Sequence, residues 1–176
     1  KSYAAKNFGY PVFNADIEVS KLYKKDKNIF IKLKKILPNQ VYSFPINKNE
    51  ISEAILSNKF NLEKIVKIIH FEIKKKMKIF LKKNKNKKFV ILDIPLLLEN
   101  KIDKEGDILI FVQSKKLEIL KRLRKRPNFN RKIINKFKSI QLPIDYKRKK
   151  AQFIIKNDFT KRSVKKSIKI ILNKIL

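Results

Sequence analysis

Apolar residues recur at helical spacing along much of the chain, separated mainly by lysines. Between Ile51 and Lys83 they return about every three or four residues, which is the period of one face of an α-helix. This face consists of Leu62, Ile65, Val66, Ile69, Ile73, Met77 and Phe80. The pattern predicts further helices over residues 1–8, 17–37, 115–126, 130–140 and 161–175.

Short apolar runs between these helices predict β-strands. The run Phe89–Ile94 is continuous, as expected for a strand of a parallel sheet covered on both faces. Further strands are expected at Pro11–Asn14, Ile108–Val112 and Phe153–Ile155. Strands that alternate with amphipathic helices predict an α/β fold with a parallel sheet sandwiched by helices.

The chain of 176 residues fits a single domain, residues 1–176, with enough length to bury a sizeable core. The helical segment between residues 24 and 85 is too long for a simple crossover between parallel strands. We therefore expect it to form a lobe over the sheet. Residues 38–49, which carry two prolines and several asparagines, are expected to be a loop, and the lysine-rich residues 82–88 a solvated turn.

Composition excludes several kinds of site. The absence of cysteine excludes disulfides, thiolate zinc sites and cysteine nucleophiles, and the single histidine excludes a multi-histidine metal centre. The hydrophobic content of 43% is too high for a disordered polycation. No apolar run approaches the roughly 20 residues that span a bilayer, and no secretory signal opens the chain, so we expect a soluble cytoplasmic protein.

The formal charge of +31 has two possible origins. A strongly basic protein often binds nucleic acid. Here, however, 40 of the 46 basic residues are lysine, and lysine, isoleucine, asparagine and phenylalanine together make up more than half of the chain. These four residues share AT-rich codons, so the base composition of the genome also accounts for much of the charge.

The arginines are more informative than the lysines. Five of the six lie in one stretch of the sequence, at Arg122, Arg124, Arg126, Arg131 and Arg148. A guanidinium offers a planar fork for phosphate oxygens, so an arginine kept among so many lysines indicates an anion-binding segment. The alternative is a solvated helix face.

The first two residues match the end of a phosphate-binding loop. Lys1 and Ser2 correspond to the last two positions of the motif G-x-x-x-x-G-K-[ST], in which lysine reaches the outer phosphates and the hydroxyl holds magnesium. A predicted helix follows at once, and a helix N-terminus favours bound anions. Gly9 and a buried strand ending near Asp16 come next.

From this point several segments resemble the dephospho-CoA kinases, which are P-loop kinases similar to the nucleoside-monophosphate kinases. Residues 9–16 carry a glycine and a proline that lead into a strand ending in Ala-Asp. Residues 90–99 form an apolar strand followed by Pro-Leu-Leu-Leu-Glu, which is the most specific match, and residues 107–112 resemble the family's next strand.

Later positions follow the family's order. Arg122 and Arg126 stand four residues apart, with Gln141 fifteen residues further on, and Ala151 and Asn157 bracket the last strand. The resemblance therefore covers nearly the whole chain.

The chain also departs from the family pattern. Phe71 follows His70 where the family usually has proline, Leu98 replaces an aromatic residue, and Gln152 replaces an aspartate. The first strand and the glycine-rich loop are missing, and with only two glycines no other segment supplies that loop. We expect an N-terminally truncated domain that is poorly active as it stands, because its sheet would lack a central strand.

The resemblance implies that ATP phosphorylates the ribose 3′-hydroxyl of dephospho-CoA to give CoA and ADP, with Mg²⁺ as cofactor. It also implies a helical acceptor-binding lobe over about 24–85 and a mobile lid over about 121–148. The implied catalytic residues are Asp16, Lys1 and Arg126; the ATP- or phosphate-binding residues are Lys1, Ser2, Arg122, Arg126 and Asn157; the acceptor-binding residues are Asp16 and His70; and the metal ligands are Ser2 and Asp93.

Each implied role has a structural alternative. Asp16 would accept or orient the proton of the attacking hydroxyl, or else cap the helix that follows it. Asp93 would hold magnesium through water, or be a structural carboxylate. His70 would contact the acceptor, or be a satisfied structural histidine, and Asn157 would help surround the adenine, or form a turn.

The two arginines would lie on one helix face and point at one polyphosphate, because residues four apart are neighbours on a helix. The resemblance places Arg122 and Arg126 in the lid, whose closure over ATP would exclude water. Arg131 is a further candidate.

Two other functions stay open at the level of sequence. A basic nucleic-acid-binding α/β protein would lose affinity steeply as salt rises. A catalytically degenerate P-loop relative would keep the fold as an interaction domain.

Overall fold

The computed structural model describes residues 9–126 and 129–175. They divide into two compact units, the first ending at Pro95 and the second beginning at Leu96. In the described part of the chain every strand pairing is parallel, as the sequence predicts: β1 pairs with β2 in the first unit, and β3 with β4 in the second.

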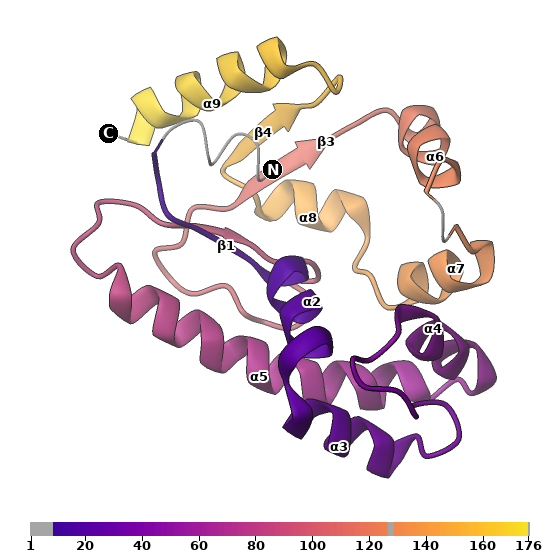
Figure 1. Ribbon diagram of the computed structural model, residues 1–176. Coiled ribbons are helices and arrows are strands. Elements are labelled where there is room, and N and C mark those ends of the chain that lie inside the picture. The colour runs from indigo at the N-terminus through magenta and orange to yellow at the C-terminus, as the bar shows by residue number, and fades with distance from the viewer. Residues whose placement is uncertain (1–8, 127–128, 176) are drawn as a thin grey trace. The chain divides into compact units, whose positions relative to one another are not determined.

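The first unit places a helical layer beside a short parallel strand pair. Strand β1 (Val12–Asn14) pairs with β2 (Ile91–Asp93) in a register that sets Asn14 opposite Asp93. The helices are α2 (Ala15–Lys25), α3 (Lys27–Ile36), α4 (Lys48–Ser57) and α5 (Asn61–Lys83). Figure 1 shows the long helix α5 running beside α2 and α3, and all three of the other helices contact it.

The core of this unit lies where these helices meet. The largest fully buried side chains are Leu22, Ile29, Leu33 and Val41. On α5 the predicted apolar face is buried at Leu62, Ile65, Ile69, Ile73 and Met77. Phe80, near the end of the same helix, packs against Phe13 of β1 with 5.6 Å between ring centroids. The helical period in the sequence therefore identified the buried face correctly.

The single helix predicted over residues 17–37 is wrong, because it is interrupted at Asp26. This residue has an extended backbone conformation, and its side chain accepts a hydrogen bond of 3.1 Å from the N–H of Ile29. Its own N–H still bonds to the carbonyl of Leu22. Aspartate competes with the helical backbone in this way, so it ends one helix and caps the next.

The helix predicted over residues 51–83 is likewise two helices. It breaks at residues 58–60, and α4 begins three residues earlier than expected because Asn47 caps it. The side-chain amide of Asn61, which is buried, donates to the carbonyl of Ala54 and so joins the two helices. The predicted loop over residues 38–49 is shortened accordingly.

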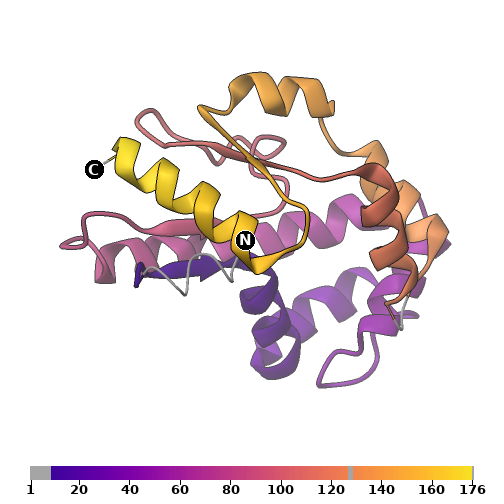
Figure 2. The ribbon, with the colours of Figure 1, turned by 90° about the horizontal axis from the view of Figure 1, so that it is seen from above.

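The second unit is a smaller assembly around β3 (Ile110–Gln113) and β4 (Phe153–Lys156). Its helices are α6 (Lys116–Arg124), α7 (Arg131–Ser139), α8 (Ile144–Lys150) and α9 (Lys161–Ile175). Helix α9 packs along β4, as Figure 2 shows, and buries Ile171 while β4 buries Ile155. Helix α8 was not predicted, because only seven residues form it and most of them are charged.

Within the described residues, no helix is both long enough and apolar enough to span a membrane.

Candidate functional site

The carboxyl ends of β1 and β2 bring two polar side chains together. The amide Nδ2 of Asn14 donates to Oδ2 of Asp93 over 2.9 Å, and Oδ1 of Asn14 accepts from the N–H of Ile17 over 2.9 Å. Asn14 therefore caps α2 and orients the half-buried Asp93 at the same time. In open α/β sheets ligands bind beyond the carboxyl ends of the strands, which makes this edge the candidate site of the first unit.

Asp16 lies two residues beyond this pair, in the first turn of α2, and is exposed. The structure rules out the alternative that Asp16 caps the helix, because Asn14 does so. A carboxylate in the first turn is favoured by the partial positive charge of the helix N-terminus. The sequence analysis singled out Asp16 but not Asn14, although an asparagine directly before a helix is a recognised capping signal.

The chemistry of this edge suits magnesium better than a transition metal. Mg²⁺ is usually held by one or two carboxylates, several waters and the phosphates of a substrate, rather than by a full protein cage. Asp93 supplies one such carboxylate beyond the end of β2. No cluster of three or more metal-ligating side chains occurs between residues 9 and 126 or between 129 and 175. Lys1 and Ser2 lie outside the residues that the structure describes.

His70 is half-buried on α5. Its neighbour Phe71 is exposed, with the ammonium of Lys75 4.5 Å from the ring centroid and that of Lys32 at 6.0 Å. Glu72 pairs with both lysines. These contacts belong to Phe71 and Glu72, the two residues that follow His70 on α5.

In the second unit, two residues singled out separately in the sequence lie against the same loop. Arg122, near the end of α6, stacks over Phe159, with 4.0 Å between the guanidinium carbon and the ring centroid. The N–H of Phe159 donates to the side chain of Asn157 over 2.9 Å, and the N–H of Asn157 donates to Gln113 over 2.7 Å. The sequence missed Phe159, and its positive φ of 66° shows that the loop turns sharply there.

The expectation that Arg122 and Arg126 share one helix face is wrong. Helix α6 ends at Arg124, and Arg126 lies beyond it with its N–H bonded to the carbonyl of Leu123. Proline at position 127 explains the early end, because the residue before a proline disfavours helical geometry. Arg126 is exposed, and Arg131 is exposed as the first residue of α7.

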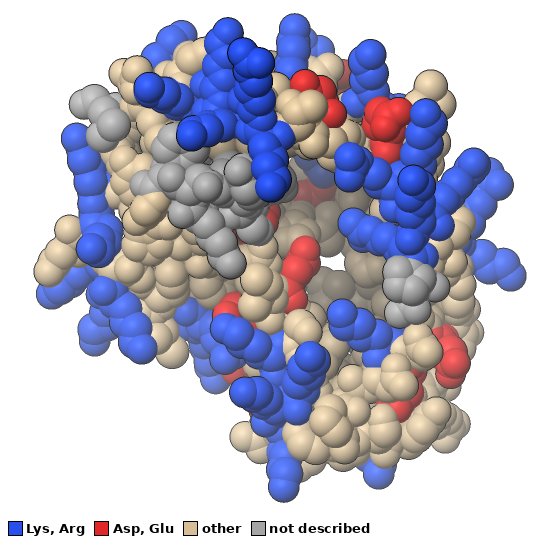
Figure 3. Space-filling view, turned by 45° about the horizontal axis from the view of Figure 1, so that its top comes forward, with Lys and Arg blue, Asp and Glu red and all other residues tan. Residues whose placement is uncertain are grey.

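Two carboxylates of the second unit have lowered pKa values. Hydrogen bonds from Ser163 and Thr160 lower the pKa of the exposed Asp158 to about 2. Burial acts to raise the pKa of Glu99, but hydrogen bonds from Lys147 and from backbone N–H groups outweigh it and lower the pKa. Figure 3 shows that the acidic side chains on the visible surface are few and that lysine and arginine side chains far outnumber them.

Each unit by itself offers groups that suit an anionic nucleotide. The first unit offers an exposed carboxylate able to take a proton and a second, oriented carboxylate able to hold a hydrated cation. The second unit offers one guanidinium, an aromatic ring and an amide beside one loop. Phosphoryl transfer needs mainly positioning and neutralisation of charge, which such groups provide.

Comparisons with known proteins agree with this chemistry. A family model described as dephospho-CoA kinase matches residues 1–162. The chain is 32% identical over 172 residues to the dephospho-CoA kinase of Wolbachia sp. subsp. Brugia malayi, covering 97% of this chain and 88% of the relative. It is 35% identical over 165 residues to the dephospho-CoA kinase of Rickettsia felis, covering 93% and 84%.

Solved structures show the same fold. A protein from Thermus thermophilus superposes with a TM-score of 0.73 at 20% identity, covering 99% of this chain and 90% of that one. The dephospho-CoA kinase from Campylobacter jejuni superposes with a TM-score of 0.61 at 22% identity, covering 98% and 88%. At these identities the likeness establishes the P-loop kinase-like fold.

Proposed function

The chain belongs to the dephospho-CoA kinase family, and we propose that it transfers the γ-phosphoryl group of ATP to the ribose 3′-hydroxyl of dephospho-CoA. The products are CoA and ADP, and the reaction is the last step of CoA biosynthesis. The family match over residues 1–162 carries this proposal. The polar groups at the carboxyl ends of β1 and β2 support it, because that is where such a fold binds its ligands.

Asp16 is the proposed general base. Its exposed carboxylate takes the proton of the 3′-hydroxyl as the hydroxyl oxygen attacks the γ-phosphorus, and the bond from that phosphorus to the β–γ bridging oxygen breaks to release ADP. Since Asn14 already caps α2, Asp16 is available for this role without weakening the helix.

Asp93 and Ser2 are the proposed ligands of magnesium. Bound Mg²⁺ would supply neutralisation of the phosphate charge. Asn14 supports the role of Asp93, because its amide holds one carboxylate oxygen in a fixed orientation. Lys1 would contact the transferred phosphoryl group.

Arg122, Arg126 and Asn157 are proposed to bind ATP, with residues 121–148 acting as a lid. The stacking of Arg122 on Phe159 supports this assignment, because it sets a guanidinium beside the loop that contains Asn157. The helical residues 24–85 are proposed to form the acceptor-binding lobe, with His70 contacting the acceptor. We further propose a cytoplasmic location, where ATP and dephospho-CoA are available.

The test is ADP release by the full-length protein from ATP and magnesium, with dephospho-CoA as acceptor and AMP, CMP and adenosine as controls. We expect turnover only with dephospho-CoA, and a loss of about 10²- to 10⁴-fold in Asp16→Asn, the usual contribution of a general base. Glu105→Gln, which changes an exposed carboxylate outside the proposed lobe and lid, should leave turnover unchanged.

A folded protein that binds ATP but transfers phosphate to none of these acceptors would contradict the proposal. Binding of RNA or DNA that weakens steeply with salt would then favour the nucleic-acid function.

A further inference from the structure

Glu99 ends the apolar segment Pro95–Glu99, and it is turned into the protein rather than toward solvent. Only 9% of its side chain is exposed. The backbone winds tightly around it: Leu96 and Lys101 have positive φ values of 56° and 49°, and the N–H of Asn100 bonds to the carbonyl of Leu96. In such a segment the direction of the Glu99 side chain is set by the backbone.

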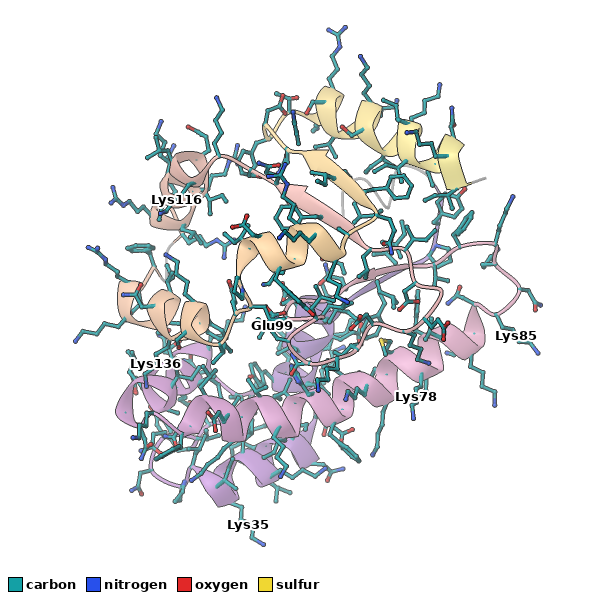
Figure 4. All side chains as sticks on the ribbon, turned by 180° about the vertical axis from the view of Figure 1, so that it is seen from behind. Lys35, Lys78, Lys85, Glu99, Lys116 and Lys136 are labelled. Atoms are coloured by element: carbon teal, nitrogen blue, oxygen red, sulfur yellow. The ribbon has the colours of Figure 1, made fainter. Side chains whose placement is uncertain are left out.

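The carboxylate makes two contacts with a segment more than forty residues further along the chain. Oε1 of Glu99 lies 2.5 Å from the ammonium of Lys147, on α8, and accepts a hydrogen bond of 3.0 Å from the N–H of Leu142, just before α8. Figure 4 shows Glu99 beside this helix. The Glu99 side chain therefore contacts both the segment that precedes α8, at Leu142, and the helix itself, at Lys147.

A pocket of about 390 Å³ lies at this junction, with Leu98, Leu142, Tyr146 and Lys150 in its wall together with Glu99 itself. Beside this pocket, the ion pair and the hydrogen bond of Glu99 join the two segments.

The charged state of the pair agrees with this geometry. Burial on its own would raise the pKa of Glu99, yet the hydrogen bonds from Lys147 and Leu142 contribute to lowering it. Glu99 is consequently ionised at neutral pH, and Lys147, with 23% of its side chain exposed, is partly shielded from water. The attraction between two such shielded charges is stronger than between two charges exposed on the surface.

We propose that Glu99 is a positioning residue that anchors residues 141–148, the carboxyl-terminal part of the lid, which we call the lid foot. This inference rests on the proposed function for its catalytic consequence. The contacts of Glu99 fix the position of the lid foot. The preceding part of the lid, which carries Arg122, Arg126 and Arg131, then closes over ATP in one defined orientation. Closure excludes water, so the anchor favours transfer to the acceptor over hydrolysis of ATP.

Two substitutions break the ion pair from opposite ends. Glu99→Gln keeps an oxygen that can accept from Leu142 but removes the charge, and Lys147→Met keeps the side-chain stem but removes the ammonium. Lys147→Arg preserves the pair and should behave like the unsubstituted protein. The matched control is Glu105→Gln, which removes an exposed charge from the same stretch of chain.

The first readout is the ratio of acceptor-independent ATP hydrolysis to phosphoryl transfer in the full-length protein. This ratio does not depend on how much of the enzyme is folded. We expect it to rise roughly two- to thirty-fold in Glu99→Gln and Lys147→Met, the range found when a residue outside a site alters coupling within it. The double variant should be no worse than the more affected single variant, since both remove one interaction.

The second readout is amide hydrogen exchange, which needs no activity. Exchange over residues 141–150 should become faster in both variants, while exchange of the paired strands β3 and β4 should not change. Unchanged exchange over residues 141–150 would overturn the anchor. Faster exchange with an unchanged ratio of hydrolysis to transfer would overturn its catalytic consequence. An unsubstituted protein that transfers no phosphate would refute the proposed function, and the exchange experiment would still decide the anchor.

Discussion

The guanidinium of Arg122 lies over the ring of Phe159, with its central carbon 4.0 Å from the ring centroid. The two residues are far apart in the chain, one near the end of α6 and the other in the loop after β4. Their contact joins an exposed helix to the strand pair of the second unit. Contacts of this kind are strengthened by the planar, weakly hydrated guanidinium, which lysine lacks.

The first prediction follows from this difference between arginine and lysine. Arg122→Lys keeps the charge but loses the stacked geometry, so we expect the Kd for ATP to rise roughly three- to ten-fold, equivalent to about 0.7–1.4 kcal/mol. Equilibrium binding of ATP to the full-length protein measures this. Arg124→Lys, an exposed arginine on the same helix, is the control. An unchanged Kd in Arg122→Lys would show that only the charge matters, and equal rises in the two variants would show that the contact with Phe159 has no specific role.

Asn14 supports the candidate site in two ways, and the two can be separated. Asn14→Ala removes the helix cap and the bond to Asp93, and should lower the free energy of unfolding by about 0.5–2 kcal/mol. Asn14→Ser keeps a capping oxygen but not the amide, so it should recover most of this stability. Both variants lack the amide that bonds to Asp93, so if Asp93 holds magnesium, both should bind the ion more weakly than the unsubstituted protein does. Urea unfolding and magnesium titration are the measurements.

Leu33 tests where the stability of the first unit comes from. Its side chain is fully buried on α3, whereas Ile31, two residues earlier, is 60% exposed. We expect Leu33→Ala to lower the free energy of unfolding by about 2–5 kcal/mol, because it removes buried apolar groups and leaves a cavity. Ile31→Ala should change it by less than about 0.5 kcal/mol. Denaturant unfolding measures both values. If the two variants lost similar amounts of unfolding free energy, Leu33 would not be part of the core that stabilises this unit.

Tyr23 provides a pH-dependent prediction. Burial raises the pKa of its phenol from 10.0 to about 12. A group whose pKa is higher in the folded state stabilises the fold fully below its unfolded pKa, and this stabilisation is lost as pH rises through the folded pKa. The contribution of Tyr23 should therefore decline between pH 10 and about 12.

The many lysines titrate in the same range, so the comparison must be with Tyr23→Phe. The difference in free energy of unfolding between the two proteins should fall by up to about 1.4 kcal/mol per pH unit across this window. A difference that stays constant from pH 9 to 12 would show that the phenol is solvated.

The buried face of α5 was predictable because helical periodicity is a local property of the sequence. Leu62, Ile65 and Ile69 recur at the helical period, and any compact structure must bury such a stripe. The strands were predictable as short apolar runs between amphipathic helices, but the expected cover on both faces is incomplete, since Ile110 and Ile154 are 43% and 40% exposed.

Breaks within helices were harder to predict. Asp26 and the stretch at 58–60 interrupt runs whose apolar period continues on either side. Whether a polar side chain caps a new helix or points into solvent depends on where the next helix can pack, which the local pattern does not contain. Helix α8 was missed because its few apolar residues form no repeated stripe.

By itself, the sequence determined the α/β character, the parallel strands, the apolar helix faces and the positions of Asp16, Asp93 and Arg122 along the chain. Only the tertiary structure decided which residues contact one another. Asn14 donates a hydrogen bond to Asp93, and Arg122 stacks on Phe159. Glu99 pairs with Lys147 and accepts a hydrogen bond from Leu142. Each of these contacts joins residues between 37 and 79 positions apart. Periodicity fixes which face of an element is buried, whereas the partner across that face is set by strand register and packing, which depend on the whole folded chain.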